Sequence, residues 1–402
     1  MLKEEDPELI EILTTLNYFI VDKVIQKRQL PDKRYYIGSG KLDEIKTLLT
    51  SIDVDRIVVD GVLTPMQHHN LEHELQKDVR DRVWLVLEIF EKNAISYEAK
   101  LQVDLARMQY MGPFIREWIH KAKAGEHPGF MGGGEYGLDD YYLFIKRKKR
   151  QIIQQLKQKE VQKIKEKLIL KERGWLIAGL AGYTNAGKST LHRALCKSSV
   201  DVSPFIFTTL QPKSSSIKVW NAKIVIEDTI GFIEGLPNDV IEGFRTTLNC
   251  LKASDIILFV IDGSDPPEEI KRKVTVSFDI FKSNEISHIC PILNKADLLN
   301  EKMIKDANKI VKDIVGKEPI PVSALKNQNL NEIIRFILQN TPRIRHSSMV
   351  VSNNIEPQML DSLLKNIVYY ELTPENNLFK IEYYCREELA FKIEKVISTI
   401  GL

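Results

Sequence analysis

The sequence feature that most constrains the fold is the segment 182–189, which reads Gly-Tyr-Thr-Asn-Ala-Gly-Lys-Ser. It follows an apolar run at 175–181 and precedes a helix-like run at 190–197. A strand, a glycine-rich loop and a helix in this order form a phosphate-binding loop, because the loop amides and the helix N-terminus face the anion. Lys188 is expected to reach the β- and γ-phosphates, and Ser189 to place its hydroxyl on Mg²⁺. The segment therefore predicts a nucleotide site in an α/β domain.

Two further motifs are expected to contact Mg²⁺, the γ-phosphate and the base of a guanine nucleotide. An apolar segment at 223–227 is followed by Asp-Thr-Ile-Gly, in which Asp228 is expected to reach Mg²⁺ and the amide of Gly231 the γ-phosphate. Another apolar segment, at 288–293, is followed by Asn-Lys-Ala-Asp. The last carboxylate, Asp297, can accept both the ring N–H and the amino group of guanine, two donors that adenine does not present together. Because each motif follows a predicted strand, the sequence predicts a guanine-nucleotide domain that binds GTP and GDP.

A switch segment is expected at 199–214, where Thr209 can close over Mg²⁺ and the γ-phosphate. Loss of that phosphate would release the segment. We assign catalysis to Lys188, Thr209 and Gly231, and Mg²⁺ binding to Ser189, Thr209 and Asp228. Nucleotide binding is assigned to Gly182, Asn185, Gly187, Lys188, Ser189, Thr190, Asp228, Gly231, Asn294, Lys295, Asp297, Ser323 and Ala324.

Length, charge and cysteine usage limit the other possibilities. A chain of 402 residues is long enough for two to four domains, and its net charge of +2 predicts no partner by itself. The four cysteines lack paired spacing, which favours a reducing compartment over a disulfide framework or a zinc site. The N-terminus has no apolar signal segment, and no apolar run approaches transmembrane length. We therefore expect a cytoplasmic protein without a membrane span, and a monomer is favoured.

The chain is expected to divide into four parts. Alternating helix-like and strand-like segments predict a small α/β domain with a largely parallel sheet at the N-terminus. Two long helical stretches predict an antiparallel helical hairpin. The last part reads strand, helix (358–365), strand (367–372), strand (378–384) and helix (387–400), which predicts a small α+β domain. The expected boundaries are 1–95 for the N-terminal domain, 96–173 for the hairpin, 174–340 for the nucleotide domain and 346–402 for the C-terminal domain.

Two features of the N-terminal part have alternative interpretations. The loop 36–41, Tyr-Ile-Gly-Ser-Gly-Lys, opens a helix that would hold an anion, although a tight strand-to-helix turn is favoured. His68, His69 and His73 lie on one predicted helix, and the last two have metal-ligand spacing. A solvated helix face is favoured, because no convergent Cys or further His supports zinc. The helix-like segments are 8–16, 41–49 and 65–76, and the strand-like segments are 18–26, 56–60 and 84–90.

The predicted hairpin carries concentrated positive charge. Residues 146–150 read Lys-Arg-Lys-Lys-Arg and follow a glycine-rich segment, 125–137, that is expected to be a mobile loop beside Tyr136, Tyr141 and Tyr142. A charge run is usually a solvated helix face, whereas mobile backbone and aromatic rings suit irregular RNA. The sequence supports both interpretations about equally. The same bias continues at Lys157, Lys159, Lys163, Lys165 and Lys167.

Several segments together resemble the HflX family of GTPases, which associate with the large ribosomal subunit. The most specific are the phosphate loop extended to Thr190, Phe-Thr-Thr-Leu at 207–210, Asp-Thr-Ile-Gly-Phe at 228–232 and Phe-Arg-Thr-Thr-Leu at 244–248. The resemblance implies an α/β fold in which a P-loop, Ras-like G domain follows an N-terminal family domain and a helical hairpin. It also implies binding to the large ribosomal subunit and its rRNA, and splitting of stalled or idle ribosomes under stress. The alternative is a GTP-switched RNA-binding factor in subunit assembly or tRNA modification.

Three positions modify what the resemblance implies. Residues 132–142 are more similar to archaeal relatives than to the bacterial pattern. Phe232 stands where many small GTPases have a Gln that orients the attacking water, and an apolar ring cannot hydrogen-bond that water. We therefore expect slow turnover without a partner. Asn185 matches a position at which potassium-activated GTPases hold a monovalent cation, which suggests K⁺ as a second cofactor beside Mg²⁺. A role for Asn185 in capping the loop is at least as well supported.

Overall fold

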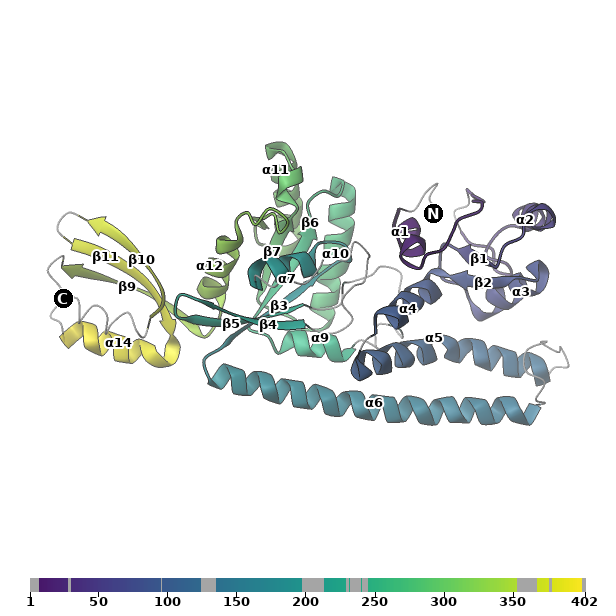
Figure 1. The fold of residues 1–402 in the computed structure, drawn as a ribbon, viewed down its shortest axis with the longest axis horizontal. Coiled ribbons are helices and arrows are strands. Elements are labelled where there is room, and N and C mark those ends of the chain that lie inside the picture. Colours follow the sequence, from purple (N-terminus) through teal and green to yellow (C-terminus); the bar gives the residue numbers. More distant parts are fainter. Residues whose placement is uncertain are drawn as a thin grey trace. The chain divides into compact units, whose positions relative to one another are not determined.

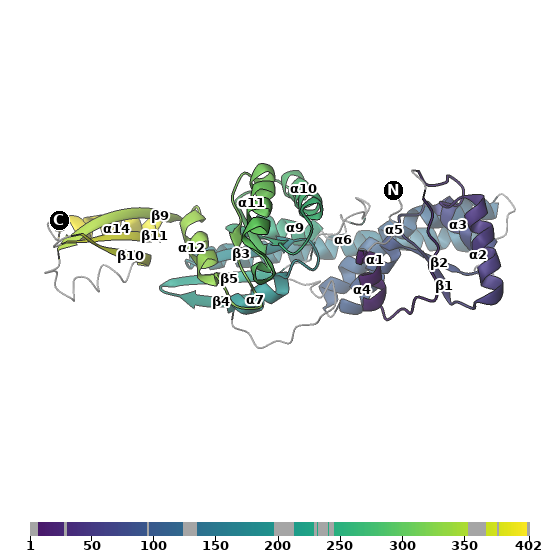
Figure 2. The same cartoon turned by 90° about the horizontal axis from the view of Figure 1, so that it is seen from above.

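The structure is a computed structural model that describes residues 7–27, 30–94, 96–123, 135–196, 213–228, 231, 240, 245–352, 367–375 and 378–399. Figures 1 and 2 label its helices and strands along the chain. The chain forms two compact units. The first contains residues 1–159, 203–211 and 233–246, and the second contains residues 160–202, 212–232 and 247–402.

The first unit begins with a small α/β part. Strands β1 (Arg56–Val59) and β2 (Asp78–Asp81) pair in parallel. Apolar side chains from the neighbouring helices and from β2, among them Leu42, Leu71 and Val79, form its core. The predicted helices at 8–16, 41–49 and 65–76 are confirmed as α1 (Pro7–Thr15), α2 (Ser39–Ser51) and α3 (Pro65–Leu75).

Two of the strand predictions for this part are wrong. Residues 84–90 belong to helix α4 (Arg82–Asn93), and residues 18–26 form no strand. A short buried apolar run has no periodicity that separates helix from strand, so the local cap decides. Asp81 provides that cap, because its carboxylate accepts the amide of Trp84 at 2.9 Å. Residues 78–81, which the sequence did not predict as a strand, form β2.

The first unit contains the predicted antiparallel pair of long helices, and residues 160–172 of the second helix belong to the second unit. Helix α5 (Tyr97–Lys123) and helix α6 (Glu135–Glu172) run side by side in Figure 1. The hydroxyl of Tyr97, at the start of α5, donates to Gln155, far along α6, at 3.2 Å. The two helices therefore run in opposite directions. Of the expected loop at 125–137, residues 125–134 lie outside the described residues. The packing core consists of Leu101, Leu105, Ile152 and Leu156.

The second unit is built around a six-stranded sheet in the order β4-β5-β3-β6-β7-β8. All neighbouring pairs are parallel except β4 with β5. The strands are β3 (Leu176–Gly182), β4 (Lys213–Val219), β5 (Ala222–Asp228), β6 (Ile256–Asp262), β7 (Ile289–Asn294) and β8 (Ile320–Pro321). The helices are α7 (Lys188–Cys196), α9 (Arg245–Lys252), α10 (Pro267–Ser283), α11 (Glu301–Val315) and α12 (Leu330–Asn340).

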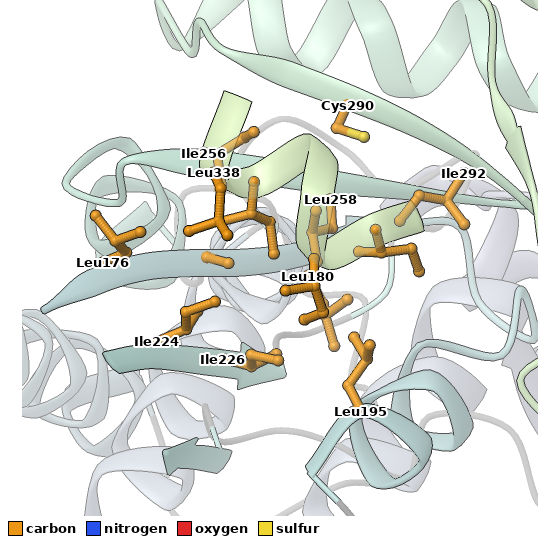
Figure 3. Close-up of a cluster of buried hydrophobic side chains, with 14 of the residues drawn as sticks. Leu176, Leu180, Leu195, Ile224, Ile226, Ile256, Leu258, Cys290, Ile292 and Leu338 are labelled. Atoms are coloured by element: carbon orange, nitrogen blue, oxygen red, sulfur yellow. The ribbon is translucent and has the colours of Figure 1, made fainter. Parts of the chain in front are cut away.

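Helices cover both faces of this sheet, which confirms the expected α/β class. On one face, α7 and α12 bury side chains such as Leu195 and Leu338 against Leu180 and Leu258 (Figure 3). On the other face, Phe281 of α10 packs edge-on against Phe259 at a centroid distance of 5.2 Å. Each fully buried side chain of this size contributes roughly 1.5–3 kcal/mol to folding. This packing fixes the ends of the parallel strands, where the predicted motifs lie.

A three-stranded antiparallel sheet follows in the same unit, in the order β10-β11-β9. Asn221, in the turn between β4 and β5, donates to the carbonyl oxygen of Ile367 at 2.8 Å. The ring of Trp220 packs against that of Tyr369 with a centroid distance of 4.3 Å. These contacts attach the small sheet to the large one. The predicted helix at 358–365 lies outside the described residues. The elements are β9 (Ile344–Ser352), β10 (Ile367–Glu375), β11 (Leu378–Arg386) and α14 (Glu387–Thr399).

Candidate nucleotide-binding site

The predicted phosphate loop connects the end of β3 to the start of α7. Gly182 has a φ of 146°, and a Cβ there would lie 2.2 Å from the carbonyl oxygen of Val260, so only glycine fits. Asn185 and Gly187 also have positive φ angles, of 61° and 88°. The loop thus turns so that α7 begins directly after it, at Lys188. The first amides of a helix have no partner within it and attract an anion, which makes this loop a phosphate cradle.

Lys188 is buried against the loop that it follows. Its Nζ donates to the carbonyl oxygen of Tyr183 at 2.8 Å, and burial lowers its pKa to about 8, an effect that nearby Asp228 partly opposes. Gly231 lies against the same ammonium, since a Cβ at Gly231 would be 2.7 Å from Nζ. The structure therefore brings together the cation and the glycine that were predicted to face the outer phosphates. A phosphate here would favour the charged lysine.

Ser189 and Asp228, which were predicted to bind Mg²⁺, are in contact with each other. The hydroxyl of Ser189, in the first turn of α7, donates to Oδ2 of Asp228 at 2.6 Å. Asp228 ends β5 and is fully buried. Hydroxyl and carboxylate oxygens are the ligands that Mg²⁺ prefers, so this donor set fits the ion. When bound, Mg²⁺ would neutralise charge on the phosphate oxygens. The third predicted ligand, Thr209, lies outside the described residues.

Asn294 joins the phosphate loop to the loop that follows β8. It is buried at the end of β7, where Nδ2 donates to the carbonyl oxygen of Ala186 at 2.9 Å. Its Oδ1 accepts the amide of Ala324 at 3.1 Å. The side chain thus bonds to backbone through both of its polar ends. This geometry gives Asn294 a bridging role between the two loops, and it binds the amide of Ala324, a residue that was assigned to nucleotide binding.

Asp297 and Lys295 lie in the loop after β7, where the guanine base was predicted to bind. The hydroxyl of Ser323 donates to Oδ1 of Asp297 at 2.5 Å and orients that carboxylate. The ammonium of Lys295 donates to Oδ2 of Asp262 at 2.5 Å. The sequence analysis did not include Asp262. This residue ends β6, so it shows the same pattern as the other site residues, a polar side chain at the end of a buried strand.

A cavity of about 890 Å³ opens beside these loops within the second unit. Thr190 and Arg193 line it from α7, and Ala324 and Leu325 from the opposite loop. Thr190 was predicted to contact nucleotide, and it faces a space of the size that small-molecule ligands occupy. Of the residues assigned to nucleotide binding, Thr190 and Ala324 line this cavity.

Most of the predicted switch segment lies outside the described residues, as does Phe232. The exceptions are Lys213 and Ser214, which begin β4 and pair with the end of β5. The predicted segment therefore includes two residues that belong to the sheet.

The predicted features of the N-terminal part have different outcomes. At the loop 36–41 the chain turns, and the amide of Gly38 donates to Oε1 of Gln26 at 2.8 Å, which agrees with the tight-turn interpretation. The three histidines do not share a solvated face, so that prediction is wrong for His68. His68 is buried, with Nε2 3.0 Å from the carbonyl oxygen of Val79 and its ring edge-on to Phe114 of α5. Packing of α3 against α5 buries it.

The basic residues of α6 divide into two groups. Lys146, Lys148 and Arg150 are exposed, as the prediction of a charged surface requires. Lys167 is instead buried, and its Nζ lies 2.6 Å from Oε2 of Glu227. Including Lys167 in the exposed basic run was wrong. The sequence carries no local signal for this pair, because the two residues are distant along the chain.

Comparison with known proteins identifies the family. Residues 3–91 match the family described as GTP-binding GTPase N-terminal, residues 93–168 the GTP-binding GTPase middle region and residues 177–295 the 50S ribosome-binding GTPase. GTPase HflX of Methanocaldococcus jannaschii is 35% identical over 395 residues, which are 98% of this chain and 95% of that protein. GTPase HflX of Thermococcus kodakarensis is 36% identical over 315 residues, 78% of this chain and 71% of that protein. The chain belongs to the HflX family.

This HflX-family chain is therefore a GTPase, an enzyme that binds guanine nucleotide and hydrolyses GTP to GDP and phosphate. Among solved structures, a GTP-binding protein from the archaeon Sulfolobus solfataricus in complex with GDP is 28% identical. The match covers 84% of this chain and 96% of that one, with a TM-score of 0.46. In the part of this HflX protein that the structure describes, no helix has both the length and the apolar character needed to cross a membrane.

Proposed function

We propose that this HflX-family GTPase is a cytoplasmic protein that binds the large ribosomal subunit and splits stalled or idle ribosomes under stress. The observation that carries the proposal is the exposed basic run of α6, with Lys146, Lys148 and Arg150 in contact with solvent. In a chain with a net charge of only +2, such a run concentrates positive potential where RNA phosphates can bind. The family description of residues 177–295, 50S ribosome-binding GTPase, supports the same partner.

Hydrolysis would use the residues gathered at the strand ends. Lys188 would neutralise phosphate charge, and Ser189, Asp228 and Thr209 would hold Mg²⁺. The amide of Gly231 would bind the γ-phosphate. Because the residue after it is a phenylalanine, turnover in the absence of a ribosome would be slow.

The nucleotide would be selected and held by the remaining site residues. Asp297 would accept the two guanine donors, Asn294 would keep the phosphate and base loops together, and Lys295 would lay its stem along the base. K⁺ beside Asn185 would add positive charge at the phosphates. The cavity lined by Thr190 would receive part of the nucleoside.

The proposal is tested with a triple variant, Lys146→Glu, Lys148→Glu and Arg150→Glu. Removing one cation that binds an RNA phosphate lowers the salt slope of RNA binding by roughly 0.7–0.9. We expect weaker binding to purified large subunits, a shallower salt dependence and unchanged affinity for GDP. The matched control replaces Lys302, Lys305 and Lys309, exposed residues at the surface of α11, with Glu and changes net charge equally. Equal ribosome affinity and salt slope in both triple variants would contradict the proposal.

The alternative is a GTP-switched RNA-binding factor in subunit assembly or tRNA modification. The same basic residues favour it, because phosphate contacts do not by themselves select the RNA. Sedimentation of the chain with GTP and with mature large subunits, precursor particles or tRNA separates the two functions. Preferential binding to mature subunits, followed by dissociation of intact ribosomes on GTP addition, supports the first. A monomer in size-exclusion chromatography is expected in both cases.

A further inference from the structure

Lys167 of α6 is a buried cation with three acceptors in the second unit. Its Nζ donates to Oε2 of Glu227 at 2.6 Å, to the carbonyl oxygen of Cys250 at 2.6 Å and to Oγ of Ser254 at 3.2 Å. A lysine ammonium has three N–H donors, so each of them has a partner here. Only about 5% of the residue is exposed. A buried charge with a complete set of partners holds those partners in fixed positions, because any shift would leave the charge unpaired.

The first partner, Glu227, is the residue directly before Asp228 on β5. Successive side chains of a strand point to opposite faces of the sheet, so the two carboxylates face opposite ways. Asp228 faces α7 and accepts the hydroxyl of Ser189, whereas Glu227 faces the ammonium of Lys167. The last peptide of β5 is therefore held from both faces of the sheet. The position of the Asp228 carboxylate depends on the ion pair between Glu227 and Lys167 on the opposite face.

The second partner lies at the other end of the segment that contains Gly231. The carbonyl oxygen of Cys250 belongs to the last turn of α9, and Ser254 follows in the turn before β6. The carbonyl oxygen of Cys250 also accepts the amide of Ala253 at 3.2 Å, and carbonyl oxygens at a helix C-terminus interact favourably with cations. One ammonium thus fixes both β5, which leads into the Asp228–Gly231 motif, and α9, which follows that motif.

Lys167 belongs to a row of α6 residues that contact the G domain. Asn249 donates to Oε1 of Glu160 at 2.8 Å, and the Nζ of Lys171 lies 3.0 Å from Oδ1 of Asp255. Lys171 anchors the same helix four residues later but touches no residue beside the metal-binding pair. Its partner Asp255 also accepts from Arg343 at 2.7 Å, so it keeps a cation when Lys171 is removed. Lys171 is therefore the matched control for Lys167.

We propose that Lys167 is a positioning residue for GTP hydrolysis: through Glu227 it fixes the end of β5 that places Asp228 for Mg²⁺, and through Cys250 it fixes the end of α9, where the chain returns to the sheet. It touches neither nucleotide nor metal. Lys167 thereby determines the positions of Asp228 and Gly231 relative to the phosphate loop.

The test compares Lys167→Met with Lys171→Met in the full-length chain. We measure kcat for GTP, and, separately, the Mg²⁺ concentration that half-maximally slows release of a fluorescent GDP analogue. Loss of a residue that orients a metal ligand typically lowers metal affinity by about 10–100-fold. Lys167→Met should raise the half-maximal Mg²⁺ concentration about tenfold or more and lower kcat. Affinity for GDP in EDTA should stay within about twofold, because the phosphate and base loops are unchanged. Lys171→Met should leave all three quantities near wild type.

A second variant keeps the test decisive if Lys167→Met does not fold. Lys167→Met combined with Glu227→Met replaces the ion pair with apolar side chains of similar length, a change that proteins often tolerate without loss of stability. This double variant should fold, as judged by thermal unfolding, and show the same increased Mg²⁺ requirement. A folded double variant with the wild-type Mg²⁺ requirement overturns the proposal. An equal defect in Lys171→Met also overturns it, since any loosening of α6 would then be sufficient.

Discussion

The hydroxyl of Ser189 lies 2.6 Å from the carboxylate of Asp228, although 39 positions separate them in the sequence. The sheet creates this contact, because β3 and β5 are parallel neighbours in which Leu180 is paired with Asp228. The loop that leaves β3 and the end of β5 therefore meet at the same edge. The contacts between residues at this edge can be tested by substitution.

The first prediction concerns guanine selection by Asp297. In Asp297→Asn an oxygen remains to accept the hydroxyl of Ser323, so the loop should keep its structure. The amide NH₂ opposes the guanine amino group but matches the carbonyl oxygen of xanthine. We expect preference to shift toward XTP by about 1–3 kcal/mol, the cost of an unpaired buried group. Competition binding of GTP and XTP measures it, and wild-type preference in the variant would refute the assignment.

The second prediction concerns the contact between Gly187 and Asn294. A Cβ at Gly187 would lie 2.2 Å from Nδ2 of Asn294, whose polar atoms are already bound, and φ is 88°. Gly187→Ala should lower the free energy of unfolding by about 2–4 kcal/mol and weaken GDP binding at least about tenfold. Chemical denaturation and fluorescence titration check this.

Gly316→Ala is the control for that substitution. Gly316 ends α11 with φ of 81°, and nothing lies within 4 Å of its Cβ position. It should cost only about 1 kcal/mol of backbone strain and leave GDP affinity unchanged. Similar losses of GDP affinity in the two variants would show that the contact with Asn294 is unimportant.

The third prediction follows from the lowered pKa of Lys188. With a pKa of about 8 instead of the usual 10.5, native protein without nucleotide binds fewer protons than unfolded protein between these two values. The free energy of unfolding should therefore rise with pH in that window, and the contribution is lost as pH falls below about 8. Phosphate binding restores the charge. Calorimetry in two buffers should show uptake of roughly half a proton per GDP at pH 8, and little at pH 6.5.

Lys188→Arg provides the control for this titration, because a guanidinium stays protonated throughout the range. Its GDP binding is expected to be weaker, with no proton uptake by residue 188. Proton uptake at pH 8 that is equal in the wild type and the variant would place the titrating group elsewhere.

The fourth prediction separates the two roles of Asn185. This residue is exposed and has a φ of 61°, a conformation that Asn and Gly tolerate. Asn185→Gly keeps the backbone conformation and removes only the side-chain amide. If the oxygen of that amide helps to hold K⁺, wild-type GTP turnover should be faster in K⁺ than in Na⁺, and the variant should lose the difference while still binding GDP. Equal wild-type rates in the two salts would leave Asn185 with the loop-shaping role alone.

The amino-acid sequence by itself determined the phosphate loop, the apolar strands that the polar motifs follow and the class of the enzyme, whereas the order of the strands in the sheet came from the structure. These features are local: Gly182 and Gly187 are needed for backbone conformation, and each polar motif directly follows an apolar run. The C-terminal strands and helix were predictable for the same reason, because alternation and helical spacing are read over a few neighbouring residues.

Tertiary structure alone decided the features that depend on distant partners. The sequence placed Lys167 in an exposed basic run, whereas the fold pairs it with Glu227, 60 positions away. His68 was predicted to be solvated, but α5 covers it. The apolar residues 84–90 are compatible with a strand or a helix, and the cap provided by Asp81 makes them helical. Burial and long-range hydrogen bonding determine these outcomes. Neither leaves a periodic or compositional signal in the sequence, since each depends on which surface a residue meets after the chain has folded.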